Sequence, residues 1–258
     1  FRVLDLAPAA RLVGIDVDRA TPPIATANAE RLGLGKRARF ARMSLWDREV
    51  VALLDAERPA LVVCNPPYIP EPPGGALPVE AGAGPDGAAH VRRVIDLARR
   101  ARPAALALSW CSLSDPAGVV AYAEAAGFRL ASLFAVAIAD GEYSGAVSRY
   151  LRTVPTAFFS EEPDVVATVA PDGAARFAYL LLAGVFLPQG DGTATVSCAP
   201  SPAASFVDGM MRDFVRRGPD ALVAASASPA APFPLAAWLL DRWDELALRA
   251  YLHGALDA

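Results

Sequence analysis

The tetrapeptide Asn65-Pro66-Pro67-Tyr68 directly follows the apolar run LVVC and combines residue types that can hold a planar nitrogen group. The side-chain carbonyl of Asn65 and the backbone carbonyl of Pro66 can accept the two N–H bonds of an amide or an aromatic amine. Two consecutive prolines restrict the backbone so that both oxygens face one pocket. Tyr68 offers a flat face for stacking. A rigid turn that only ends a strand is the alternative interpretation.

Two segments upstream place acids within apolar, β-prone runs. VLDL occupies residues 3–6 and contains Asp5, and LVGIDV occupies residues 12–17 and contains Asp16. We predict both as strands of one parallel sheet, because strands buried on both faces are apolar throughout. Asp16 then stands where nucleotide-binding sheets place the acid that accepts ribose hydroxyls. Its alternative role, capping the helix that follows, suits Asp18 or Thr21 better.

The connection between these two predicted strands is too short. Only residues 7–11 separate them, whereas a parallel crossover needs about a dozen residues or more. Nucleotide-binding sheets carry a glycine-rich loop after the first strand, and no glycine precedes Gly14 here. Either that loop belongs to the protein as a mobile, unresolved segment between residues 6 and 12, which we favour, or it has been deleted and the nucleotide site with it. Asp5 orients the loop in the first case, or is a buried structural acid.

Strands and helices alternate over the rest of residues 1–187. A helix over residues 24–33 ends at Gly33, and a helix over residues 88–101 carries an apolar stripe made by Val91, Val94, Ile95 and Ala98. A third helix begins after Asp115 and ends at Gly127. Further strands are predicted at residues 37–47, 60–64, 104–113, 128–138 and 177–187. This alternation predicts an α/β fold with a doubly wound, mostly parallel sheet.

The motifs VLDL, VGIDVD and VVCNPPYIP, in this order, are similar to those of the class I S-adenosylmethionine-dependent methyltransferases, whose fold is Rossmann-like. The chain resembles the branch with an NPPY motif, which includes the protein-glutamine N5-methyltransferases (HemK/PrmC-like) and the amino-methylating DNA enzymes. The segment EP…GPDGAAHVRRVI after NPPY is similar to its counterpart in the glutamine-methylating group. The resemblance covers about residues 1–187, with no further match to that group beyond Leu130.

The resemblance implies an N-methyltransferase that acts on a planar amide or amine nitrogen. Methyl transfer from a sulfonium is an in-line displacement, so the main tasks are positioning the acceptor and removing water from it. The residues implied in catalysis are Asn65, Pro66 and Tyr68, and Pro67 completes the acceptor-binding segment. Trp110, at the end of a predicted strand, forms a wall of the acceptor pocket or belongs to the core. No metal site is implied.

The implied cofactor is S-adenosylmethionine. The positions that the resemblance assigns to it are Asp5, Asp16, Ser44, Leu45 and Asn65. Ser44 stands where relatives place an acid that meets the adenine amino group, and a serine there accepts a weaker hydrogen bond or is simply a strand-end residue. Leu45 would pack against the adenine ring, with burial in the core as its alternative role.

Residues 188–258 depart from the family. A turn-rich stretch is followed by two amphipathic helical segments at residues 205–218 and 235–256. We expect these helices to cover the substrate side of residues 1–187 or to form a homodimer interface.

Composition restricts the partners and the compartment. The net charge of −4 argues against a nucleic-acid partner, which usually requires a basic face. No apolar run reaches the roughly 20 residues of a membrane span, and three cysteines without CxxC spacing indicate a reducing, cytoplasmic setting. We therefore expect a small-molecule or protein amide or amine as acceptor, with DNA third. A non-catalytic scaffold that has lost cofactor binding is the other hypothesis.

Overall fold

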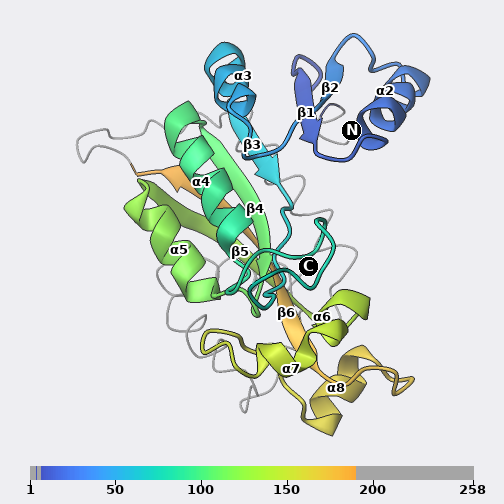
Figure 1. Ribbon diagram of the computed structural model, residues 1–258. Coiled ribbons are helices and arrows are strands. Elements are labelled where there is room, and N and C mark those ends of the chain that lie inside the picture. Colours follow the sequence, from blue (N-terminus) through green and yellow to red (C-terminus); the bar gives the residue numbers. More distant parts are fainter. Residues whose placement is uncertain (1–3, 5–6, 190–258) are drawn as a thin grey trace, which may run out of the picture. The chain divides into compact units, whose positions relative to one another are not determined.

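The computed structural model describes Leu4 and residues 7–189, which fall into two compact units, one within residues 1–60 and one within residues 61–190 (Figure 1). Both units combine strands with helices, and this confirms the predicted α/β class. The interpretation of residues 1–187 as one domain stays a prediction. The predicted helices of the C-terminal extension lie outside the described residues.

The first unit contains a parallel pair of strands joined by a helix. Strand β1 (Leu12–Asp16) pairs with β2 (Ala38–Arg42), and α2 (Thr21–Arg31) connects them. Gly33 follows α2 with a φ of 71°, a left-handed conformation that favours glycine. Helix α3 (Glu49–Glu57), which the sequence patterns did not predict, follows β2. The buried core of this unit contains Leu4, Ala29, Leu34 and Ala38.

The short connection before β1 is held by hydrogen bonds to Arg37. Ala10 N–H donates to the Ala7 carbonyl at 2.9 Å, which closes a turn. Leu12 N–H then donates to the backbone carbonyl of Arg37. The Arg37 guanidinium bonds the carbonyls of Leu4, Ala7 and Ala10 at 2.6, 3.1 and 3.2 Å. That a further glycine-rich loop belongs between residues 6 and 12 stays a prediction.

The predicted strand at residues 3–6 is wrong at Leu4, the residue of that segment that the structure describes. Leu4 is helical and only 1% exposed. A five-residue connection cannot return the chain to start a parallel neighbour of β1, so Leu4 packs against α2 and β2 instead. Asp5 lies outside the described residues.

The second unit is built on a four-stranded sheet. Its strands are β3 (Leu61–Cys64), β4 (Ala105–Cys111), β5 (Phe128–Ala139) and β6 (Ala178–Pro188), in the order β3-β4-β6-β5. β3 and β4 are parallel, and β6 is antiparallel to both β4 and β5. Three of these four strands therefore point the same way, in agreement with the predicted mostly parallel sheet.

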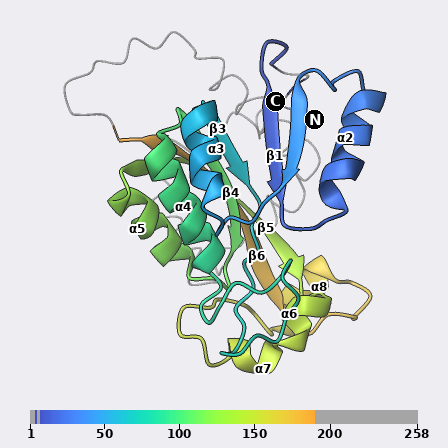
Figure 2. The same cartoon turned by 45° about the horizontal axis from the view of Figure 1, so that its top comes forward.

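Helices α4 (Ala89–Ala101) and α5 (Pro116–Ala125) lie side by side along this sheet (Figures 1 and 2). The stripe predicted on α4 is confirmed, since all four of its members are buried. Asp115 caps α5 as predicted, because its carboxylate accepts the Gly118 N–H at 3.2 Å. Local sequence signals therefore placed both helices and the face that α4 buries.

The segment between β5 and β6 forms three short helices, α6 (Glu142–Ala146), α7 (Ser148–Leu151) and α8 (Pro163–Val169). Asp140 anchors its two ends: the carboxylate accepts the backbone N–H groups of Arg176 and Phe177 at 2.7 and 3.2 Å, and it pairs with the Arg176 guanidinium at 3.1 Å. In the part of the chain that the structure describes, no helix is both long and apolar enough to cross a membrane.

Candidate functional site

Asp16 is the last residue of β1 in the first unit, and one of its two carboxylate oxygens accepts a hydrogen bond. Oδ1 accepts the Asp18 N–H at 2.8 Å, whereas no described residue donates to Oδ2. The cap-like contacts before α2 belong to Asp18, whose carboxylate accepts the Ala20 N–H at 3.1 Å and the Thr21 hydroxyl at 3.4 Å. Asp16 therefore does not cap α2, which begins at Thr21 without a side-chain cap, and its Oδ2 is available to a ligand hydroxyl.

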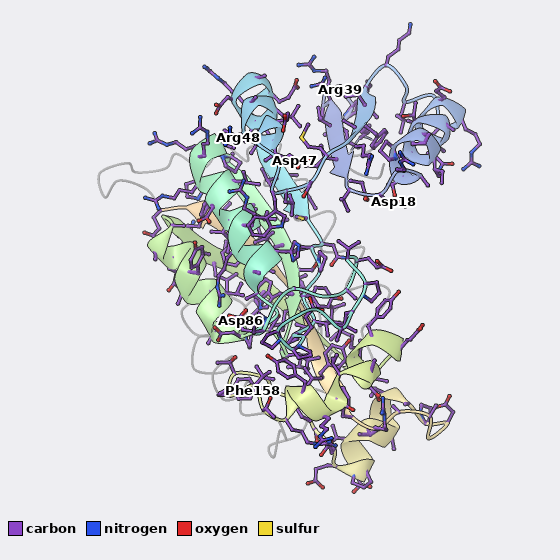
Figure 3. The ribbon with its side chains drawn as sticks, viewed as in Figure 1. Asp18, Arg39, Asp47, Arg48, Asp86 and Phe158 are labelled. Atoms are coloured by element: carbon purple, nitrogen blue, oxygen red, sulfur yellow. The ribbon has the colours of Figure 1, made fainter. Side chains whose placement is uncertain are left out.

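Ser44 and Leu45 lie in a tight turn after β2. The Ser44 hydroxyl accepts the Trp46 N–H at 3.2 Å, and the Asp47 carboxylate folds back to accept the Ser44 N–H at 2.8 Å (Figure 3). The Asp47 carboxylate therefore lies beside Ser44, which is the polar residue expected at this place in the sheet. Asp47 was not among the predicted site residues, although its place three residues after Ser44 is typical of such turns.

Asn65 stands directly after β3 in the second unit, beside β4. Cys64 pairs with Leu108 in the parallel register, so the next pair along the strands is Asn65 and Ser109. The Ser109 hydroxyl donates a hydrogen bond to Asn65 Oδ1. Ser109 was missed by the sequence analysis, because only strand register shows that it meets Asn65.

The other end of the tetrapeptide also rests on β4. The Cys111 thiol donates to the Tyr68 carbonyl at 3.6 Å, and Tyr68 packs against a core cluster that contains Ile69, Cys111 and Tyr179. Residues two apart on a strand lie on the same face, so Ser109 and Cys111 support Asn65 and Tyr68 from one face of β4. No described residue donates to the Pro66 carbonyl, which leaves it able to accept an N–H.

The loop after the tetrapeptide folds back on it. The Ile69 N–H donates to the Ala81 carbonyl at 3.1 Å, and the Ile69 carbonyl accepts the Ala83 N–H at 3.0 Å. The Glu71 carboxylate accepts the N–H groups of Ala76 and Leu77 at 2.9 and 3.0 Å. Burial acts to raise the pKa of Glu71, but these backbone donors, together with nearby His90, lower it overall.

Four further hydrogen bonds tie this loop to the helices or to the start of α4. The Asp86 carboxylate bonds the Ala88 N–H at 3.1 Å and the Arg92 guanidinium at 2.6 Å at the start of α4 (Figure 3). The Tyr143 hydroxyl of α6 donates to Glu80 at 3.2 Å, and the Tyr150 hydroxyl of α7 donates to the Pro85 carbonyl at 3.0 Å. The segment around Asn65 is therefore held from β4, α4, α6 and α7.

Trp110 has the contacts of a core residue. It is fully buried, and its ring centroid lies 5.9 Å from that of Phe186. A Cβ at Gly184 would come within 2.7 Å of the Trp110 ring, so the indole occupies the space that a side chain on β6 would need. The predicted role of Trp110 as a wall of the acceptor pocket stays a prediction.

The thiols of Cys64 and Cys111 are kept protonated by burial, which raises their pKa values to about 11 and about 12. At pH 8 the thiolate fraction of Cys64 is then about 100-fold below that of a thiol with the ordinary pKa near 9. We expect both thiols of a Cys198→Ser protein to react with a thiol reagent at pH 8 at least about 100-fold more slowly in the folded than in the unfolded protein. Cys64→Ala and Cys111→Ala assign the two phases. Rapid labelling of the folded protein would contradict this burial.

The predicted site residues thus fall into two sets. Asp16, Ser44 and Leu45 belong to the first unit, and Asn65, Pro66, Pro67, Tyr68 and Trp110 belong to the second. The segment from Asn65 to Tyr68 is bonded to β4 through Ser109 and Cys111. Trp110 is buried in the core.

No protein-family model and no curated protein matches the chain. Similar solved structures include the [4+2]-cyclase SpnF, with 15% identity and a TM-score of 0.38, covering 72% of this chain and 70% of that one. A geranyl diphosphate methyltransferase in complex with SAM has 12% identity and a TM-score of 0.33, covering 68% of each chain. A chain of the E. cuniculi Mtq2–Trm112 complex, responsible for methylation of the termination factor eRF1, has 14% identity and a TM-score of 0.31, covering 70% of this chain and 91% of that one. At these TM-scores the likeness carries no argument about activity.

Proposed function

We propose that the protein is an S-adenosylmethionine-dependent N-methyltransferase whose acceptor is a planar amide or amine nitrogen, in a small molecule or a protein side chain. The observation that carries this proposal is the pair of carbonyl oxygens at the end of β3. Asn65 Oδ1 is oriented by Ser109, and the Pro66 carbonyl accepts no hydrogen bond from any described residue. Two such acceptors can hold both N–H bonds of one NH₂ group.

The tasks of these residues follow from the weak nucleophilicity of a planar nitrogen. Hydrogen bonds from its two N–H groups to Asn65 and Pro66 aim the lone pair and become stronger as positive charge develops on the nitrogen. Tyr68, half-buried beside the core, offers an apolar face to a planar acceptor. Burial, with Cys111 nearby, raises the pKa of Tyr68, so its hydroxyl stays neutral at pH 7.

The cofactor can be matched to this chain only in part. When bound, S-adenosylmethionine would supply an electrophilic methyl group on a sulfonium. Asp16 Oδ2 and the turn at residues 44–47 offer polar groups to a nucleoside. The connection at residues 7–11 contains no glycine, so it offers no glycine-rich backbone to the remainder of the cofactor, and its Ala7 and Ala10 carbonyls are bound by Arg37.

This connection favours a second candidate function, that of a non-catalytic protein which has the acceptor-binding segment and binds no cofactor. In that case the segment at residues 65–68 would bind a planar amide or amine without modifying it. Cofactor affinity separates the two candidates.

Calorimetric titration with S-adenosylhomocysteine tests the proposed function. A methyltransferase should bind it with a micromolar dissociation constant, and Asp16→Ala should weaken binding about 10- to 100-fold, because a charge-assisted hydrogen bond to the ligand is lost. Asp18→Ala, two residues away and engaged before α2, is the matched control and should leave the affinity unchanged. Absence of binding at millimolar ligand would overturn the methyltransferase proposal and favour the non-catalytic protein.

A further inference from the structure

We propose that Ser109 is a positioning residue that holds the Asn65 carboxamide in the orientation in which it binds the acceptor nitrogen. This inference rests on the proposed function, and it deepens it by adding a residue to the acceptor site that no sequence motif contains.

Strand register places the two residues side by side. Because Cys64 pairs with Leu108, the following residues Asn65 and Ser109 are neighbours across the parallel pair. Directly opposed residues of adjacent strands share a face of the sheet and approach closely. The Ser109 hydroxyl uses this proximity to donate to Asn65 Oδ1.

Asn65 needs such a partner because of where it stands. Its side chain is exposed and its residue is the first after β3, so core packing does not fix the carboxamide. The terminal torsion of an asparagine is intrinsically broad, and a rotating carboxamide would present N–H and C=O alternately to a ligand. The Ser109 hydroxyl on strand β4 fixes the plane of the Asn65 carboxamide and occupies one lone pair of Oδ1.

The bond also defines what remains for the acceptor. Oδ1 has two lone pairs, of which Ser109 occupies one, so a single N–H of the acceptor binds there. The second N–H has the Pro66 carbonyl, to which no described residue donates. A primary amide or amine, with two N–H bonds on one nitrogen, therefore fits this pair of oxygens best.

The composition of the chain makes a direct test possible. The sequence contains two asparagines, Asn28 and Asn65, so selective ¹⁵N-asparagine labelling yields two side-chain NH₂ signals. Asn28 lies on α2, where its Oδ1 accepts a hydrogen bond from Arg31 at 3.1 Å, and serves as the internal reference. Asn65→Ala identifies the signal of Asn65.

The expected result concerns the mobility of the Asn65 carboxamide. In the wild-type protein its N–H order parameter should approach that of rigid backbone, about 0.85, and in Ser109→Ala it should fall below about 0.6. Ser109→Thr keeps the hydroxyl and should restore rigidity. Ser132→Ala, a strand serine of β5 separated from β4 by β6, is the matched control and should change neither signal. Equal mobility of Asn65 in the wild-type and Ser109→Ala proteins would overturn the proposal, as would an equal effect of Ser132→Ala.

Turnover separates the failure of this inference from that of the proposed function. With tritiated S-adenosylmethionine and benzamide as the probe amide, Ser109→Ala should lower kcat/KM for the amide about tenfold while S-adenosylhomocysteine affinity and Tm stay unchanged, and Ser109→Thr should recover most of the activity. A wild-type protein that binds no S-adenosylhomocysteine overturns the proposed function. The amide signals decide the role of Ser109 in either case.

Discussion

Asn65→Ala is expected to lower methyl transfer at least about 100-fold, which is the typical cost of removing one preorganised polar group from a reaction centre. The substitution deletes Oδ1, the oxygen that Ser109 orients and that we assign to an acceptor N–H. The loss should appear in kcat as well as in kcat/KM, because this hydrogen bond strengthens as charge develops on the nitrogen. Transfer of tritium from labelled S-adenosylmethionine to primary amides and amines measures it.

The controls for this prediction lie within the same chain. Asn28→Ala removes the other asparagine, on α2 of the first unit, and should leave turnover unchanged. Asn65→Asp retains an oxygen that accepts from Ser109 and from the acceptor, so it should retain more activity than Asn65→Ala. The affinity for S-adenosylhomocysteine should be the same in all three proteins. Full turnover by Asn65→Ala would contradict the assignment of Asn65 to the acceptor site.

Trp110→Ala is expected to lower the free energy of unfolding by about 3–5 kcal/mol, the usual cost of truncating a buried tryptophan. The indole is fully buried, contacts Phe186 and fills the space above Gly184. Trp110→Phe should cost about 1–2 kcal/mol, because it leaves a smaller cavity and removes a buried indole N–H that has no hydrogen-bond partner among the described residues. Chemical denaturation followed by circular dichroism measures both changes.

The same substitution tests the two roles considered for Trp110. Trp46 is 56% exposed, so Trp46→Ala is the matched control and should change stability by less than about 1 kcal/mol. If Trp110→Ala kept full stability but lost turnover, the tryptophan would be a wall of the acceptor pocket rather than a core residue.

The helices that the sequence predicted correctly are those with local signals. The stripe on α4, the Asp115 cap of α5 and the left-handed glycines after α2 and α5 each depend on residues within a few positions of one another. The helices that it missed are mostly very short: α6, α7 and α8 have five, four and seven residues, and α3, with nine, begins without a capping side chain. Short elements of this kind are stabilised by contacts with the rest of the fold.

The strand at residues 3–6 shows where a local pattern misled. VLDL is apolar and β-prone, but Leu4 is helical and buried against α2 and β2. The shortness of residues 7–11 was visible in the sequence, and it argued for a missing loop. In the structure no crossover separates Leu4 from β1, and Leu4 does not pair with β1 as a parallel strand.

The sequence by itself determined the α/β class, the central strands and the end of β3 at the tetrapeptide of residues 65–68, because periodicity, capping residues and two adjacent prolines act over short distances along the chain. Only the tertiary structure decided that β6 runs antiparallel between β4 and β5, that Trp110 lies in the core, and that Ser109 meets Asn65. Each of these depends on which strands pair and in which register. Register joins residues 44 positions apart, and no local pattern encodes it.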